Sequence, residues 1–115
     1  MDNVAKVYAA LSDPIRLRIL ALVARERELC VCELVDALGL SQPKISRHCK
    51  ALNEAGVLNS RRQAQWVIYS LADDVPDWIH QTREAALQGV RQEMQYKMDS
   101  KRLDLVQRPS VREMA

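Results

Sequence analysis

The sequence predicts a mainly α-helical fold that carries one small β-hairpin, and two patterns predict it. Apolar residues recur three and four positions apart through most of residues 2–98, which is the period of helices that bury one face. Residues 57–62 and 66–71 instead alternate between apolar and polar side chains, as two strands joined by a tight turn do. We therefore expect an α+β domain in which the hairpin follows several helices.

Length and composition set the broad class. A chain of 115 residues is the length of one domain with a modest core. It has no apolar run long enough for a signal peptide or a membrane span, so we expect a cytoplasmic protein with no membrane partner. The three cysteines are an odd number, which argues against a disulfide framework and indicates thiols kept reduced.

The first helices follow from capping residues. Asp2 can cap a short helix whose apolar face includes Val4, Val7, Tyr8 and Leu11. Residues 12–14, Ser-Asp-Pro, then end that helix and begin a second one, which runs to about Arg25 and is apolar enough to be core.

Residues 28–52 are predicted to form a pair of short helices joined by a tight turn. Leu34 and Leu38 repeat at the helical period, and Gly39 can end that helix in a left-handed conformation. Ser41 is a good N-cap for the next helix, whose buried stripe is Ile45, Cys49 and Leu52. This spacing is typical of a helix-turn-helix.

The opposite face of the second helix is polar and cationic. Residues 41–62 contain five cations and a single carboxylate, Glu54, although the whole chain carries a net charge of only +2. Such a concentration of cations suits contact with phosphates, and polar side chains can read base edges in a major groove. The candidate DNA-binding residues are Gln42, Lys44, Ser46, Arg47, His48, Lys50, Arg61 and Arg62. His48 lies between the polar face and the core stripe, so it could serve packing or phosphate contact.

The hairpin is expected to act as a wing beside this helix. Its strands flank the turn Gln63-Ala64-Gln65, and Arg61 and Arg62 are placed to contact phosphates or a minor groove. A last helix is expected from Asp73 or Asp74 to about Met98. Its apolar stripe is longer than one small domain can cover, which predicts a two-fold homodimer and a pseudo-palindromic DNA site. The domain is thus residues 1–98, and residues 99–115 are expected to be a flexible or loosely docked tail.

Three segments resemble the ArsR/SmtB family of winged helix-turn-helix repressors: ELCVCEL, LGLSQPKISRH and RRQAQWVIYSL. The resemblance runs from about Val4 to Met98, and Cys30-Val31-Cys32 is similar to the arsenic-responsive branch. It implies a dimeric repressor of an arsenic-resistance operon that leaves its operator when trivalent arsenic (arsenite) or antimony binds Cys30 and Cys32. Relatives usually have glycine in place of Ala64 and a cation in place of Gln65.

The two cysteines can share one ion only in a particular backbone conformation. Thiolates are soft ligands that select thiophilic ions. In a regular helix, residues i and i+2 point about 200° apart, whereas in an extended segment they point the same way. Chelation therefore requires the first helical turn to be absent or unwound at Cys30 and Cys32. The alternatives are two ordinary core cysteines and a reversible dithiol redox switch.

A third ligand is not evident. The resemblance places a third thiolate where this chain has Val35, and Cys49 lies on the core stripe, where packing is favoured over ligation. A small thiol could complete the site, or the inducer could be a methylated arsenical that offers two bonds. A tetrathiolate cadmium or lead site is disfavoured because residues 1–28 hold no cysteine. His80 lacks a second histidine and is expected to be an ordinary residue of the last helix.

An enzyme is not expected. The chain lacks a Gly-rich phosphate loop, an HExxH motif and a GxSxG motif. The remaining alternative is a winged-helix repressor that responds to another thiophilic metal, to thiol redox state or to a protein partner.

Overall fold

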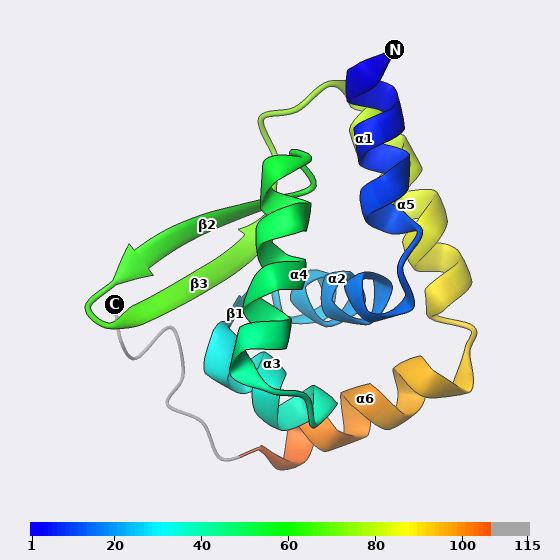
Figure 1. The fold of residues 1–115 in the computed structure, drawn as a ribbon. Helices are drawn as coiled ribbons and strands as arrows, with labels where there is room; N and C mark the ends of the chain where they lie inside the picture. The colour runs from blue at the N-terminus through cyan, green and yellow to red at the C-terminus, as the bar shows by residue number, and fades with distance from the viewer. Residues whose placement is uncertain (107–115) are drawn as a thin grey trace.

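The computed structural model describes residues 1–106 and confirms a mainly helical α+β fold (Figure 1). Within this range the chain forms six helices and three strands. In order, they are α1 (Asp2–Leu11), α2 (Pro14–Glu26), β1 (Glu28–Cys30), α3 (Val31–Leu38), α4 (Gln42–Glu54), β2 (Leu58–Gln63), β3 (Trp66–Leu71), α5 (Asp77–Val90) and α6 (Met94–Leu105). None of these helices is long and apolar enough to cross a membrane.

Most of the predicted helix boundaries are confirmed. The Asp13 carboxylate accepts hydrogen bonds from the backbone N–H groups of Ile15 and Arg16 at the start of α2, and Ser41 Oγ accepts one from Lys44 N–H at the start of α4. Gly39 ends α3 at φ 68°, in the left-handed region. The expected cap at Asp2 is wrong, because Asp2 is already helical and Met1 precedes α1.

The sheet has three antiparallel strands in the order β1-β3-β2. Strands β2 and β3 form the predicted hairpin, and Gln63 pairs with Trp66 across a two-residue turn in which Ala64 adopts φ 54°. Strand β1 was not expected, since the sequence pattern of residues 28–38 predicts a helix. Its three residues are too few to show an alternating pattern, and it exists because Leu29 and Cys30 pair with Tyr69 and Ile68 of β3.

Helix α2 runs through the centre of the molecule, with α1 lying beside α5 and the hairpin projecting from the other side (Figure 1). Its Ile19 and Leu20 are fully buried, and they share one core with Leu34 of α3, Ile45 of α4 and Leu87 of α5. This core fixes α3 and α4 relative to each other and holds the polar face of α4 outward.

The expected single last helix is wrong. The chain turns at residues 91–93, and α6 then packs back against α2 and α3 instead of continuing α5 (Figure 1). Two contacts account for the turn: Leu103 enters the core, and the buried Asp99 carboxylate accepts two hydrogen bonds from Arg18, at 2.9 and 3.0 Å. A straight helix to Met98 would leave both side chains without these partners.

The break in the last helix also changes the expected domain boundary. Residues 99–105 belong to α6, and both Asp99 and Leu103 are 1% exposed, so the expected tail is not loose over this stretch. The rest of the expected tail, residues 107–115, lies outside the described residues. One long apolar stripe therefore no longer predicts a dimer, because α5 and α6 each bury part of that stripe within the chain.

Candidate DNA-binding surface and cysteine pair

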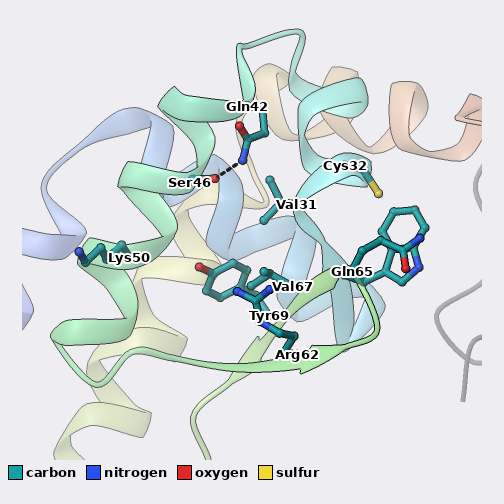
Figure 2. Close-up of a pocket in the computed structure, with 10 residues that line it drawn as sticks. Val31, Cys32, Gln42, Ser46, Lys50, Arg62, Gln65, Val67 and Tyr69 are labelled. Atoms are coloured by element: carbon teal, nitrogen blue, oxygen red, sulfur yellow. Dashed lines mark hydrogen bonds between the residues drawn. The ribbon is translucent and has the colours of Figure 1, made fainter.

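Helix α4 and the wing, formed by β2 and β3, enclose a groove of about 490 Å³ (Figure 2). Gln42, Ser46 and Lys50 occupy successive turns of α4 and line one wall, where Gln42 Nε2 donates a hydrogen bond to Ser46 Oγ at 2.9 Å. Arg62 lines the groove from the wing. Four of the candidate DNA-binding residues thus lie around one concave surface, as the helical spacing and strand alternation predict.

His48 is directed toward the rest of the protein. It is half-buried, and its Nδ1 accepts a hydrogen bond from Arg16 Nε at 3.2 Å and lies 4.0 Å from the Asp13 carboxylate. Burial lowers the pKa of His48 despite the neighbouring Asp13 carboxylate. The structure therefore gives this side chain a packing role between α4 and the start of α2.

The two wing arginines lie on opposite faces of β2, because adjacent residues of a strand alternate. Arg62 faces the groove, whereas Arg61 forms an ion pair with Glu28 of β1, with nitrogen-oxygen distances of 2.9 and 2.8 Å. Both members of the pair are partly exposed. The Arg61 guanidinium is thus held on the sheet by Glu28 of β1 and by Gln63 of β2.

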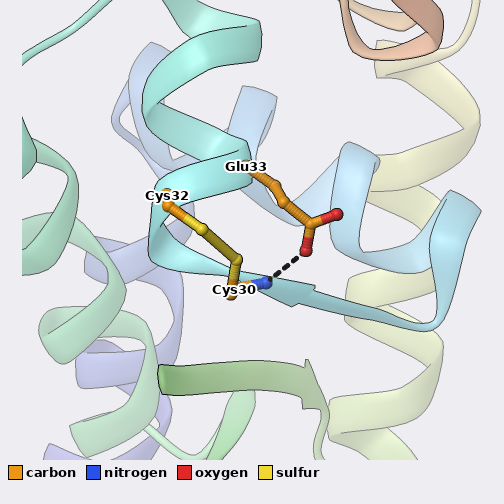
Figure 3. The surroundings of a disulfide bond; sticks show 3 residues. All are labelled: Cys30, Cys32 and Glu33. Atoms are coloured by element: carbon orange, nitrogen blue, oxygen red, sulfur yellow. Dashed lines mark hydrogen bonds between the residues drawn. A yellow bond between two sulfur atoms is a disulfide. The ribbon is translucent and has the colours of Figure 1, made fainter. Parts of the chain in front are cut away.

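Cys30 and Cys32 meet at the junction of β1 and α3, where the structure joins them as a disulfide (Figure 3). Cys30 is the last residue of β1 and has extended dihedral angles, φ −84° and ψ 161°, while Cys32 lies in the first turn of α3. Their Cα atoms are 5.4 Å apart. The two side chains thus converge because Cys30 lies outside the regular helix, as the two-residue spacing requires. The expectation of two reduced thiols differs from the structure, in which the pair is a disulfide.

The cysteine pair lies against the wing. Cys30 pairs with Ile68 of β3, and Cys32 and Trp66 pack against these two buried residues in a small apolar cluster separate from the main core. Glu33 accepts a hydrogen bond from Cys30 N–H at 2.9 Å and thereby secures the start of α3 (Figure 3). Sequence reasoning missed the contact with the wing because it depends on β1, although Trp66 and Ile68 do share one face of their strand.

The third cysteine belongs to the main core and not to the cluster of the pair. Cys49 is fully buried on the core face of α4, and burial raises the pKa of its thiol to about 12, so it is held neutral. Among residues 1–106 no group of three or more histidine, cysteine, aspartate and glutamate side chains is placed to hold a metal ion. His80 instead lies within hydrogen-bond distance of the Asp73 carbonyl and of Arg83, at 3.0 and 3.1 Å.

A buried arginine that sequence reasoning missed connects α5 to the base of the wing. Arg83 is 5% exposed and donates hydrogen bonds to the carbonyl oxygens of Val57 and Ala72, at 3.1 and 2.8 Å, on either side of the hairpin. Its position was detectable, because Ile79, Arg83 and Leu87 recur at four-residue spacing on the buried face of α5.

Comparison with known proteins agrees with this architecture. The family model described as "Bacterial regulatory protein, arsR family" matches residues 13–60. Over 83 residues the chain is 49% identical to the arsenic resistance transcriptional regulator ArsR2 of Pseudomonas putida, a match that covers 72% of each protein. The chain belongs to the ArsR family. The relatives that it matches are named as arsenic resistance transcriptional regulators and, in Escherichia coli, as an arsenical resistance operon repressor.

One further relative and two solved structures extend the comparison. The arsenic resistance transcriptional regulator ArsR1 of Pseudomonas putida is 55% identical over 84 residues, which are 73% of this chain and 62% of that protein. The homodimeric winged helix-turn-helix domain Mb0332 of Mycobacterium bovis superposes with a TM-score of 0.65 at 30% identity, over 81% of this chain and 82% of that one. The antimony-specific repressor AntR superposes with a TM-score of 0.62 at 25% identity, over 77% and 78% of the two chains.

Proposed function

We propose that this ArsR-family repressor binds operator DNA as a homodimer and leaves it when trivalent arsenic or antimony binds Cys30 and Cys32. The observation that carries the proposal is the convergence of the two cysteines at the point where β1, α3 and the wing meet. The arsenic resistance regulators among its relatives and the antimony-specific repressor AntR support this choice of inducer.

The DNA-binding surface is proposed to consist of the polar face of α4 and both faces of the wing. The residues that we assign to it are Gln42, Lys44, Ser46, Arg47, Lys50, Arg61 and Arg62, with His48 supporting α4 from behind. Polar side chains of α4 would read bases, and the arginines and lysines would contact phosphates. With about six to ten phosphate contacts per dimer, affinity should fall by orders of magnitude between 50 and 200 mM salt.

A second copy of the chain is proposed to cover the outer side of α1 and α5. Val4 and Tyr8 of α1 are 41% and 55% exposed, and Tyr8 shares a hydrogen bond with Thr82 of α5 at 3.3 Å. The homodimeric Mycobacterium bovis neighbour has the same fold. A two-fold dimer would present two α4 helices and would favour a pseudo-palindromic operator.

Release is proposed to follow from a preference of the inducer for a conformation that does not bind DNA. A cellular thiol first reduces the disulfide to two thiols. Arsenite then condenses with both thiols, so that two As–S bonds replace two As–O bonds and two water molecules leave. The bridging atom separates the two sulfur atoms and strains the start of α3 against β3, to which Cys30 is paired.

The disulfide itself supports a second candidate function. The structure joins Cys30 and Cys32, so oxidation of the same pair by a peroxide could replace the metalloid as the input. An experiment on the reduced protein separates the two signals, because arsenite acts on the reduced pair without an oxidant, whereas a peroxide acts by oxidising the pair.

The proposal is tested by fluorescence anisotropy on the DNA upstream of the gene. The protein is reduced with a phosphine, which is then removed, and arsenite is titrated into the complex of the wild type and of Cys30→Ser/Cys32→Ser. Cys49→Ala is the matched control, because Cys49 is a buried thiol outside the pair. We expect arsenite to release the wild type and the control but not the double variant. Release of the double variant, or no release at all, refutes the proposed sensor.

A further inference from the structure

We propose that Trp66 completes the cysteine site and makes it selective for trivalent arsenicals that carry one aromatic substituent. This inference rests on the proposed binding of trivalent arsenic by Cys30 and Cys32. It adds the chemical class of the inducer and a residue that recognises it, and neither follows from the cysteine pair alone.

The first step is a count of bonds. The whole chain contains three cysteines, and Cys49 is fully buried in the main core, outside the cluster of Cys30 and Cys32, with its thiol held neutral. No cluster of three ligating side chains exists among residues 1–106. Trivalent arsenic forms three bonds, so a site of two thiolates leaves one bond for a group that the inducer itself brings.

The second step is the surface that this third group would meet. Ile68 is 1% exposed, and Cys32 and Trp66 pack against it and Cys30 in a small apolar cluster. A hydroxyl buried there would lose its hydrogen bonds to water, whereas a carbon substituent would lose none. The indole of Trp66 adds a planar surface on which an aromatic ring can stack.

The third step is space. Cys32 and Trp66 line the same groove of about 490 Å³ between α4 and the wing (Figure 2). This volume accommodates a six-membered ring beside the indole. The other walls include Gln42, Lys50 and Arg62, which are assigned to DNA contact, so a ring in this groove would also occupy part of the surface that meets DNA.

The reaction needs no oxidant once the pair is reduced. A phenylarsonous acid has one As–C bond and two As–O bonds. Both thiols attack arsenic, two As–S bonds form as two As–O bonds break, and the two thiol protons leave with the hydroxyl groups as water. Arsenic remains trivalent and keeps its As–C bond, so the phenyl group becomes the third substituent.

The test is a calorimetric titration of the full-length, phosphine-reduced protein with arsenite, methylarsonous acid and phenylarsonous acid. A dithiol without a protein around it already prefers phenylarsonous acid or arsenite to some degree, and this intrinsic preference is the same for every variant. The measured quantity is therefore the ratio of the affinity for phenylarsonous acid to the affinity for arsenite, compared between variants. We expect Trp66→Ala to lower the phenyl-to-arsenite ratio about five- to tenfold and to change arsenite affinity less than twofold. Trp66→Phe should keep most of the ratio, and Trp78→Phe on α5 is the control for loss of an indole elsewhere.

Each outcome decides a different point. An unchanged ratio in Trp66→Ala overturns the inference while leaving arsenite sensing intact. An equal loss for all three arsenicals assigns Trp66 a structural role and also overturns it. If none of the three binds more tightly to the wild type than to Cys30→Ser/Cys32→Ser, the proposed function itself is wrong. Thermal unfolding of each variant establishes that the chain is folded before titration.

Discussion

Removing Arg18 should destabilise the protein about twice as much as removing its partner Asp99, although both changes delete the same ion pair. The Asp99 side chain is 2% exposed, whereas that of Arg18 is 22% exposed. Arg18→Met therefore leaves a carboxylate buried, and Asp99→Ala leaves a guanidinium that can turn toward water. The pair joins α6 to α2, so the comparison also tests how firmly α6 is held.

The magnitudes follow from this difference in burial. Stranding one member of a buried ion pair costs about 3 to 5 kcal/mol. The lower end applies to Arg18→Met, because Gln95 still donates a hydrogen bond to Asp99 at 2.9 Å. Asp99→Ala should cost about 1.5 kcal/mol, the value of a hydrogen bond to a charged group. For a domain of this size, about 3 kcal/mol lowers the melting temperature by about 12 to 24 °C.

The assay is urea unfolding followed by circular dichroism, at one fixed protein concentration because a dimer makes stability depend on concentration. Arg18→Met/Asp99→Ala completes the cycle and should be no less stable than Arg18→Met, since it strands no charge. Equal losses of less than about 1 kcal/mol in both single variants would refute the reasoning and would mean that other contacts, such as the buried Leu103 and the ion pair of Arg25 with Asp104, hold α6.

Three further predictions concern DNA affinity, pH and the wing. Glu28→Gln frees Arg61 from its ion pair and should raise operator affinity about two- to fivefold in anisotropy titrations at low salt, whereas no change would argue against a phosphate contact by Arg61. The pKa of His48 in the folded protein lies below its ordinary value of 6.5 because burial disfavours the charged ring. As the pH falls through 6.5, His48 therefore takes up a proton in the unfolded chain before it does so in the folded protein, which favours unfolding. The free energy of unfolding should therefore fall from pH 7.5 to pH 5.5, and His48→Gln should flatten this dependence in urea titrations. Ala64→Gly removes a side chain from a left-handed position and should stabilise the fold by about 0.5 to 1 kcal/mol, and a loss of stability there would mean that the turn is not strained.

Local signals were sufficient to predict the helix-turn-helix and the hairpin. Ser41 and Gly39 have the roles expected of a cap and a helix end, and the alternation of residues 66–71 matches β3. These features depend on neighbours within a few positions, so the sequence pattern contains them. The break before α6 depends instead on Arg18 and Asp99, which are 81 residues apart, and no local period carries that information.

Within the candidate site, too, some features follow from the local sequence pattern and others depend on residues far along the chain. The polar face of α4 follows from the helical period, so its residues could be assigned in advance. The environment of the cysteines could not, because Cys30 acquires its extended conformation by pairing with Ile68 across the sheet. A three-residue strand is specified by the partner that it meets, and that partner lies 38 positions further along the chain.

The position of the cysteine pair also bears on how an inducer could act. Cys30 is paired with the wing strand β3 on one side and begins α3 on the other, so a ligand that moves it must disturb both elements. Two residues earlier in β1, Glu28 holds Arg61 of the wing. The wing is thus connected to the proposed inducer site by strand pairing and an ion pair, whereas α4 is connected to it less directly, by packing against α3 and β2. A signal from the cysteines should therefore reach the wing contacts first, and the loss of DNA contacts should begin at Arg61 and Arg62 before it includes the polar face of α4.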